Sequence, residues 1–141
     1  MNKKISWREL GWLAIVVILG LSLACGNPYQ APYGAKVQMP AGTSIESSQD
    51  IVIHISALVI DKNNLPLNDV EVRFYLCCDG GYLLNMNANQ IDSEDKIRTN
   101  EIGAAEVDLY VYGDFEGDLT VSADIGTNSA ETKISKTLPS V

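Results

Sequence analysis

The stretch that decides the fold is Ile51–Ile60, which reads IVIHISALVI. Its odd-numbered positions hold aliphatic residues throughout, whereas the even-numbered positions mix aliphatic residues with His54 and Ser56. Side chains along a strand point alternately to the two faces of a sheet. This period of two residues therefore predicts a β-strand with one face in a hydrophobic core.

The same period recurs in three later segments, residues 70–76, 105–112 and 119–125. Segments rich in Gly, Pro, Asn and Asp, such as residues 61–66, separate these runs and indicate turns. The chain after the leader shows no sustained helical period. Short strands divided by turns are typical of a sandwich or barrel, so we predict an all-β sandwich of about seven strands over residues 43–141.

The N-terminal region predicts export. Residues 1–9 carry three basic side chains, and an uncharged, mainly apolar run of 15 residues, 10–24, follows them. A basic segment followed by an apolar run of this length is a secretory signal. The alternative is a transmembrane helix, which needs roughly 20 apolar residues, and Pro28 interrupts the chain soon after this run.

Residues 21–25, which read LSLAC, resemble the lipobox of bacterial lipoproteins. The resemblance implies that the Cys25 thiol takes a diacylglycerol, that residues 1–24 are cleaved as a lipoprotein signal peptide, and that the new amine is acylated. Several buried acyl chains would anchor the protein stably to a membrane. Gly26 after the cysteine resembles the outer-membrane sorting default, so we expect a lipid-anchored protein of the bacterial cell envelope, at the outer membrane.

Residues 25–42 contain three prolines, which cannot donate a backbone hydrogen bond to a helix or sheet. We expect this segment to be the lipidated cysteine followed by a flexible tether, with its last residues available as an edge strand. A flexible tether of this length reaches about 20 Å.

Four stretches also carry a family resemblance: ALVIDKNNLPLNDVEVRF, GGYL, TNEIGAAEVDL and LTVSA, which begin at residues 57, 80, 99 and 119. Their spacing resembles the group 1 bacterial immunoglobulin-like domain, the repeat of invasin- and intimin-type surface proteins, over residues 51–135. Asn64 stands where the family usually has Gly, and Asn tolerates left-handed backbone. The resemblance implies an immunoglobulin-like sandwich in a surface setting. Cell binding by invasins belongs to other domains and does not carry over.

Composition excludes several function classes. The formal charge is −8 and the leader is basic, so the remainder is more acidic still. Nucleic-acid binding rests on Lys and Arg neutralising phosphates, so we expect no nucleic-acid partner. The sequence has no phosphate-binding glycine loop and no metal-ligand spacing. We therefore expect no enzyme and no cofactor.

Cys77 and Cys78 are adjacent. Neighbouring Cα atoms lie about 3.8 Å apart, below the usual disulfide span of about 4.4–6.8 Å. A vicinal disulfide, two free thiols and an intermolecular bridge all remain open, and alternation predicts one side chain inward and one outward. Reactive thiols need an electropositive neighbourhood, which Asp79 does not supply, so we favour no catalytic role.

Acidic turns are weak calcium candidates. Asp114, Glu116 and Asp118 lie in one of them and residues 92–95 in another. Calcium takes about six to eight oxygens, and neither turn has a matched loop, so solvated turns are the favoured interpretation. The alternative function for the chain is a redox-active or metal-binding envelope protein that uses Cys77–Cys78 or these loops.

The outer face of the predicted pair of strands, 51–60 and 104–112, is the most informative surface. A solvated sheet face is normally polar, but this one keeps apolar and aromatic groups, and His54 is expected near Glu106 or Asp108. Contiguous groups of this kind mark interaction sites unless the 84–98 connection or the leading strand covers them. The candidate interface comprises Val52, His54, Leu58, Ile60, Tyr110 and Tyr112.

Together these features predict a lipid-anchored, non-catalytic immunoglobulin-like module of the cell envelope. Its expected partners are the membrane, through the N-terminal lipid, and an envelope protein, through protein–protein or surface contacts. We expect the module to serve adhesion or a structural binding role rather than catalysis.

Overall fold

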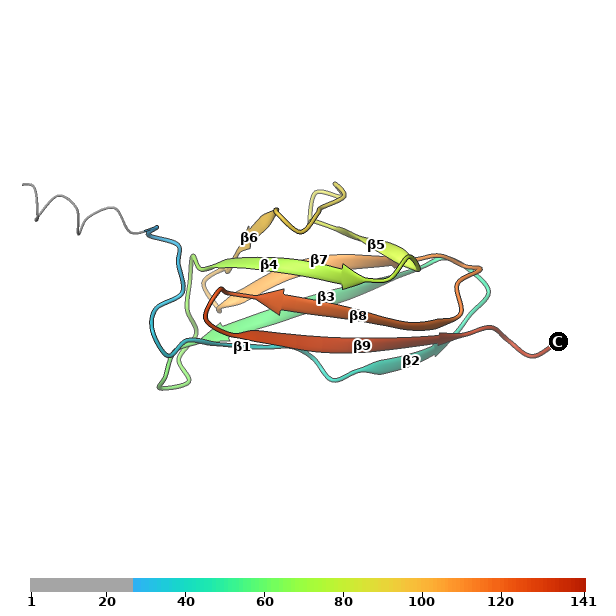
Figure 1. Ribbon diagram of the computed structural model, residues 1–141, viewed down its shortest axis with the longest axis horizontal. Helices are drawn as coiled ribbons and strands as arrows, with labels where there is room; N and C mark the ends of the chain where they lie inside the picture. Colours follow the sequence, from blue (N-terminus) through green and yellow to red (C-terminus); the bar gives the residue numbers. More distant parts are fainter. Residues whose placement is uncertain (1–26) are drawn as a thin grey trace, which may run out of the picture.

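The structure is a computed structural model that describes residues 27–141, and it is a sandwich of two β-sheets (Figure 1). The four-stranded sheet has the order β1-β3-β7-β5, and the five-stranded sheet has the order β2-β9-β8-β4-β6. In chain order the strands are β1 (Lys36–Gln38), β2 (Thr43–Glu46), β3 (Ile51–Ile60), β4 (Glu71–Cys77), β5 (Gly81–Leu84), β6 (Lys96–Arg98), β7 (Ala104–Val111), β8 (Gly117–Asp124) and β9 (Ser129–Thr137).

The period-two segments of the sequence form the central strands, so the all-β sandwich is confirmed. β3 pairs with β7 in antiparallel register from Ile51 opposite Val111 to Leu58 opposite Ala104. β8 lies between β9 and β4, also antiparallel to both. β2 pairs in parallel with the end of β9, where Thr43 lies opposite Ile134.

The core lies between the inward faces of the two sheets. Five of the largest fully buried side chains are aliphatic or aromatic and come from both sheets: Ile55, Phe74, Leu109, Leu119 and Ile134. Burying one such side chain contributes about 1.5–3 kcal/mol to folding. Each of these residues occupies an inward position of an alternating strand, which is why the alternation produces a two-layer packing.

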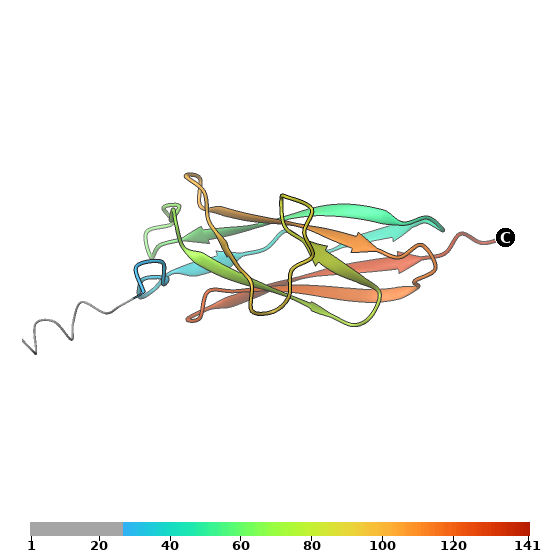
Figure 2. The same cartoon turned by 90° about the horizontal axis from the view of Figure 1, so that it is seen from above.

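The N-terminal segment of the described chain is packed on the sandwich. Ala31 and Ala35 are buried, and β1 pairs with the end of β3. The Tyr29 carbonyl accepts a 2.9 Å hydrogen bond from the Glu71 backbone N–H, and the Arg98 guanidinium lies 3.3 Å from the centroid of the Tyr29 ring. The part of the expected tether that the structure describes, residues 27–42, therefore lies against the folded body (Figure 2).

The long connection after β5 crosses from one sheet to the other. The Ile91 N–H donates a 3.0 Å hydrogen bond to the Leu83 carbonyl, and Ile91 is buried. The chain then reaches β6, which pairs with β4 at the edge of the five-stranded sheet (Figure 2). The connection thus closes one open edge of the sandwich, and Val52 on the outer face of the four-stranded sheet stays 59% exposed.

Candidate functional site

The outer face of the four-stranded sheet carries an apolar and aromatic cluster. Tyr110 in β7 lies opposite Val52 in β3 and opposite Tyr82 in β5, so these three side chains form one row across the sheet. Tyr112 follows β7 on the same side and is 39% exposed. We call Val52, Tyr82, Tyr110 and Tyr112 the tyrosine patch.

The tyrosine rings of the patch pack against one another. The Tyr82 and Tyr110 rings are stacked, with centroids 4.8 Å apart and an interplanar angle of 17°. Tyr112 lies 6.0 Å from Tyr82 and 6.1 Å from Tyr110 between ring centroids. Such pairs are favourable beyond the area they bury. The three rings therefore form a preorganised, amphipathic surface of the kind enriched at interfaces.

A carboxylate just before β3 fixes the patch. The Tyr110 hydroxyl donates a short hydrogen bond to Asp50, and the Gly113 backbone N–H donates to Asp50 Oδ1 at 2.6 Å. The hydrogen bond to Asp50 raises the pKa of Tyr110 to about 12. The same bond, together with that from Gly113, lowers the pKa of Asp50 below its usual range. Tyr110 is thus held by hydrogen bonding as well as by packing.

His54 lies one row further along the sheet, as expected from the strand pairing. Its Nδ1 is 2.9 Å from Asp108 Oδ1, and its Nε2 is 3.6 Å from Glu106 Oε1. The hydrogen bond with Asp108 raises the pKa of His54, and the charges of both carboxylates raise it further. All three side chains are partly exposed to solvent, so their geometry is that of a surface ion-pair cluster.

Two residues of the candidate interface differ from the expectation. Ile60 is only 5% exposed, because the chain after β3 folds back and Pro66 forms a bridge with it. Leu58 is half-buried, since β1 pairs alongside it at Gln38. The exposed surface is therefore concentrated at the opposite end of β3, around Val52.

Tyr82 and Asp50 are the surface residues that sequence reasoning missed. Tyr82 sits in β5, a strand of only four residues, which is too short to show a period. Asp50 reads as an ordinary turn residue, and its partner Tyr110 is 60 positions away in the chain. Placing Tyr82 beside Tyr110 requires knowing that β5 pairs with β7.

Cys77 and Cys78 are free thiols in contact, with their Sγ atoms 2.7 Å apart. Both side chains are exposed, contrary to the expected inward and outward pair, because Cys78 has a φ of 76° and leaves the strand geometry. The hydrogen bond between the thiols lowers the pKa of Cys77 and raises that of Cys78, and the Thr120 N–H, 3.3 Å from Cys77 Sγ, lowers the pKa of Cys77 further.

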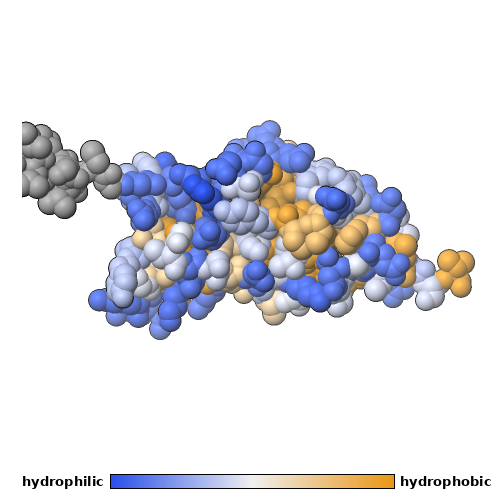
Figure 3. All heavy atoms as spheres, in the orientation of Figure 1, coloured by the Kyte–Doolittle hydropathy of each residue, from blue (hydrophilic) through white to orange (hydrophobic). Residues whose placement is uncertain are grey.

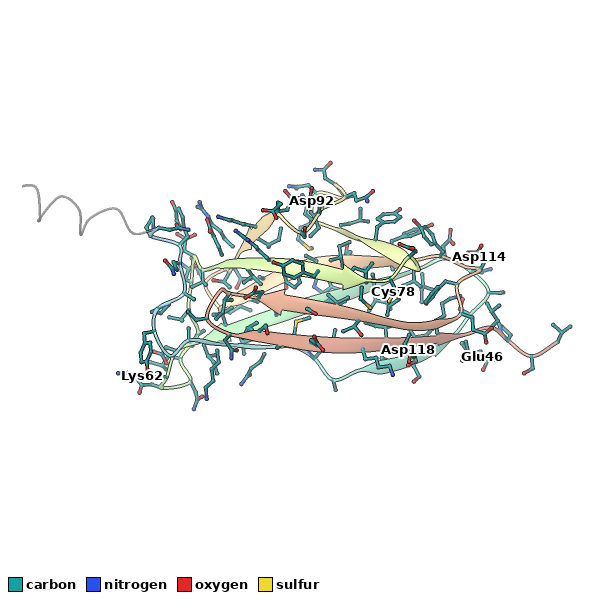
Figure 4. The ribbon with its side chains drawn as sticks, viewed as in Figure 1. Glu46, Lys62, Cys78, Asp92, Asp114 and Asp118 are labelled. Atoms are coloured by element: carbon teal, nitrogen blue, oxygen red, sulfur yellow. The ribbon has the colours of Figure 1, made fainter. Side chains whose placement is uncertain are left out.

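A cleft of about 280 Å³ opens beside Cys78. Residues of β4, β5 and the connection after β5 line it, among them Tyr75, Tyr82 and Asp92. In the view of Figure 1, hydrophobic residues gather on the surface in the half of the molecule nearer the C-terminus (Figure 3). Cys78 lies in the same half (Figure 4). The cleft is small and open, and it is lined by a thiol, two carboxylates and two phenols.

The acidic turn between β7 and β8 does not gather its carboxylates. Asp118 pairs with Lys133 at 2.7 Å and accepts a 2.6 Å hydrogen bond from Ser135, and this ion pair lowers its pKa. Asp114 and Glu116 are exposed, and Asp114 lies well apart from Asp118 (Figure 4). Among residues 27–141 no group of three His, Cys, Asp or Glu side chains is arranged to hold a metal ion.

Lys136 is a buried residue with no sequence signal. It is 1% exposed, and its Nζ donates to the carbonyls of Gly113 at 2.7 Å and Phe115 at 2.9 Å. Buried charges require such partners. Lys136 therefore ties the β7–β8 loop to β9, close to Asp50 and the end of the tyrosine patch.

The predicted lipidation residue, Cys25, lies outside the described residues, as does the predicted signal peptide. Residues 27–141 contain no helix with the length and hydrophobicity that crossing a membrane requires.

Comparison with known proteins supports the fold of this chain but assigns it to no family. No protein-family model and no curated protein matches the sequence. Among solved structures, the D00–D0 domains of intimin are 20% identical, with 81% of this chain and 51% of that one covered and a TM-score of 0.50. A β-glycosidase from Bacteroides vulgatus is 19% identical, with 74% and 14% covered and a TM-score of 0.53.

A conjugative transposon lipoprotein from Bacteroides eggerthii is 12% identical, with 73% of this chain and 98% of that one covered and a TM-score of 0.49. The chain thus spans about half of the intimin fragment and a small part of the glycosidase. The match to the intimin domains supports an immunoglobulin-like sandwich. The resemblance to the group 1 bacterial immunoglobulin-like family stands as a likeness of fold, without a sequence-level assignment.

Proposed function

We propose that this protein is a lipid-anchored, non-catalytic immunoglobulin-like module of the bacterial cell envelope, which binds a protein partner through the tyrosine patch. The observation that carries the proposal is the row of Val52, Tyr110 and Tyr82 on a solvent-facing sheet. A face with no partner is normally polar, and this row is preorganised by stacking and by Asp50.

The anchor rests on the lipobox that ends at Cys25, and the fold shared with intimin domains agrees with a surface module. Its test is the chain itself, expressed in a Gram-negative host and separated by flotation of the membranes. The native chain is expected to float with outer membranes and to carry acyl chains by intact mass. Cys25→Ser is expected to carry no acyl chains and to be absent from the outer membranes, and a Cys25→Ser protein that floats equally well with outer membranes would contradict the anchor.

The contact surface is tested by cross-linking in intact cells. A photo-reactive phenylalanine analogue at Val52 is expected to trap a discrete partner. The matched control is the same analogue at Glu131, an exposed residue on the outer side of the five-stranded sheet. Equal trapping at both positions, or none at Val52, would contradict a binding role for the patch.

A second candidate function, thiol redox chemistry, is favoured by the contact between the Cys77 and Cys78 sulfurs. Attack of the Cys77 thiolate on a small-molecule disulfide would release one thiol, and attack by Cys78 would release the second and leave a vicinal disulfide. Incubation with oxidised glutathione and counting of free thiols tests this exchange. Retention of both thiols would remove the candidate.

A further inference from the structure

Three tight turns at one end of the sandwich each carry an exposed apolar side chain at the apex. They are the turn before β1, the β3–β4 loop and the β6–β7 turn, and the residues are Tyr33, Leu65 and Ile102, with exposed fractions of 99%, 59% and 67%. Single exposed apolar residues are ordinary. A contiguous group of them marks a site of interaction.

The three turns are neighbours in space. A Cβ at Gly34 would lie 3.5 Å from the Cβ of Lys62, so the Tyr33 turn abuts the β3–β4 loop. A Cβ at Gly103 would lie 2.9 Å from the Cβ of Pro66, so the Ile102 turn abuts the same loop. Lys62 lies at the end of the molecule opposite the C-terminus (Figure 4), and the turns share that end (Figure 2).

Each apex is held rigidly by its own turn. The Asp61 carboxylate accepts hydrogen bonds from the backbone N–H groups of Asn63 at 2.7 Å and Leu65 at 3.0 Å. The Asn100 side chain does the same for Ile102 at 3.1 Å and Ala104 at 3.0 Å.

In the third turn, the Ala35 N–H donates to the Pro32 carbonyl at 3.1 Å, and Gly34 has a φ of 81°. The apolar side chains are thus presented in fixed positions, and little conformational freedom remains to be lost when they are buried.

The chain leaves the body at this same end. The Asn27 side chain donates a 3.0 Å hydrogen bond to Glu71 Oε2, and the Gln30 N–H donates to the Asn27 carbonyl at 3.1 Å. Cys25 is two residues before Asn27. Two residues span at most about 7 Å, so acyl chains on Cys25 would place Asn27 at the membrane surface rather than at the end of a long flexible tether.

We propose that the turns bearing Tyr33, Leu65 and Ile102 form a seat that dips into the interface of the bilayer holding the Cys25 lipid, so that the sandwich stands on the membrane in one orientation. The seat rests on the proposed lipid anchor. Its chemistry is apolar: Lys36 and Lys62 near these turns are offset by Asp61 and Glu101. The seat therefore fits a zwitterionic lipid surface and does not depend on anionic headgroups.

The test uses tryptophan as a depth reporter in the full, lipidated chain. Both natural tryptophans, Trp7 and Trp12, lie in the segment removed on processing at Cys25. Ile102→Trp and Leu65→Trp therefore each create the single tryptophan of the processed protein, and Leu138→Trp provides a matched control at the other end, where Leu138 is 37% exposed. Each variant is reconstituted into phosphatidylcholine vesicles with brominated acyl chains.

At positions 102 and 65 the brominated lipid is expected to lower the fluorescence about twofold, because interfacial side chains sit at the headgroup–acyl boundary. At position 138 it is expected to have no effect. Flotation with vesicles but no quenching at 102 and 65, or equal quenching at all three positions, overturns the seat and leaves the anchor standing. Failure of the native chain to float overturns the proposed anchor, and the seat with it.

Discussion

The two outer faces of the sandwich obey the same alternation but carry different chemistry. On the five-stranded sheet the outward residues pair with one another through polar groups: Asp118 with Lys133 at 2.7 Å, and Ser122 with Glu131 at 3.4 Å. On the four-stranded sheet the outward row through Tyr110 is aromatic and apolar. Packing dictates the inward half of each strand, so the outward half is where the requirements of binding become visible.

The largest effect on stability is expected from the hydrophobic core, against which both sheets pack. Phe74 is 1% exposed in the core between the sheets, and Phe74→Ala is expected to lower the free energy of unfolding by about 3–5 kcal/mol because it leaves a cavity. Chemical denaturation followed by circular dichroism measures this change. A loss within experimental error would contradict the packed core on which both faces depend.

A smaller effect, confined to the patch face, is expected from Gly81→Ala. A Cβ at Gly81 would collide with the carbonyl oxygen of Tyr110, so β5 must shift away from β7. We expect a loss of about 1–3 kcal/mol and a loss of the ring contact between Tyr82 and Tyr110, read by NMR. Ser122→Ala on the polar face is the control. Retained tyrosine ring-current shifts in Gly81→Ala would contradict the pairing.

Next in size is the ionisation of Tyr110. Its pKa of about 12 predicts that one tyrosine of the folded protein titrates well above the ordinary value of about 10. Absorbance at alkaline pH measures this step, and Tyr110→Phe is expected to remove it. A native titration without a late step would show that Asp50 does not hold the patch.

The His54 ion pairs are expected to make the free energy of unfolding depend weakly on pH. The pKa of His54 is raised in the folded state, so the stabilisation is complete below the unfolded value of about 6.5 and disappears as the pH rises through the folded value. The side chain is half exposed, so the effect is expected below about 1 kcal/mol.

Comparison of the native chain with His54→Gln at about pH 5.5 and about pH 8.5 measures this difference. A larger gap at the higher pH would contradict the pairing with Asp108. The chain has one histidine, so its NMR titration assigns the pKa without ambiguity.

The smallest effect on stability is expected from the exposed members of the patch. Val52→Ser together with Tyr112→Ser is expected to change the free energy of unfolding by less than about 0.5 kcal/mol per residue, yet to abolish capture of the partner by a chemical cross-linker added to intact cells. Lys133→Ser on the polar face is the matched control and is expected to change neither. A large loss of stability in the patch variant would show that these side chains serve packing.

Sequence reasoning was strongest where one strand shows its whole period. β3, β4, β7 and β8 followed from alternation because each has seven or more residues and an aliphatic inner face. The period of β9 was obscured, since the polar residues Thr132 and Lys136 occupy inward positions and are buried. Lys136 is held there by hydrogen bonds from its Nζ to two backbone carbonyls. Burial of a lysine depends on two carbonyls of a distant loop, which no local pattern reports.

The candidate site was predicted in part for the same reason. Val52, Tyr110, Tyr112 and the contacts of His54 followed from the alternation and pairing of two long strands. The prediction that Ile60 belongs to the exposed interface was wrong, because the loop after β3 folds back onto it. Tyr82 was missed because its strand is short. The relation between the turns of Tyr33, Leu65 and Ile102 was out of reach, since it depends on the packing of three distant loops.

The parallel pairing of β2 with β9 bears on how the molecule withstands a mechanical load. The described chain enters at one end of the sandwich and its last residues leave at the other (Figure 1). Tension between these ends would slide Thr43–Glu46 along β9, and the hydrogen bonds joining the two strands would be strained together rather than broken one after another. Such a shear geometry resists force better than one whose hydrogen bonds break in succession, and it would suit a domain with the proposed lipid anchor at its N-terminal end.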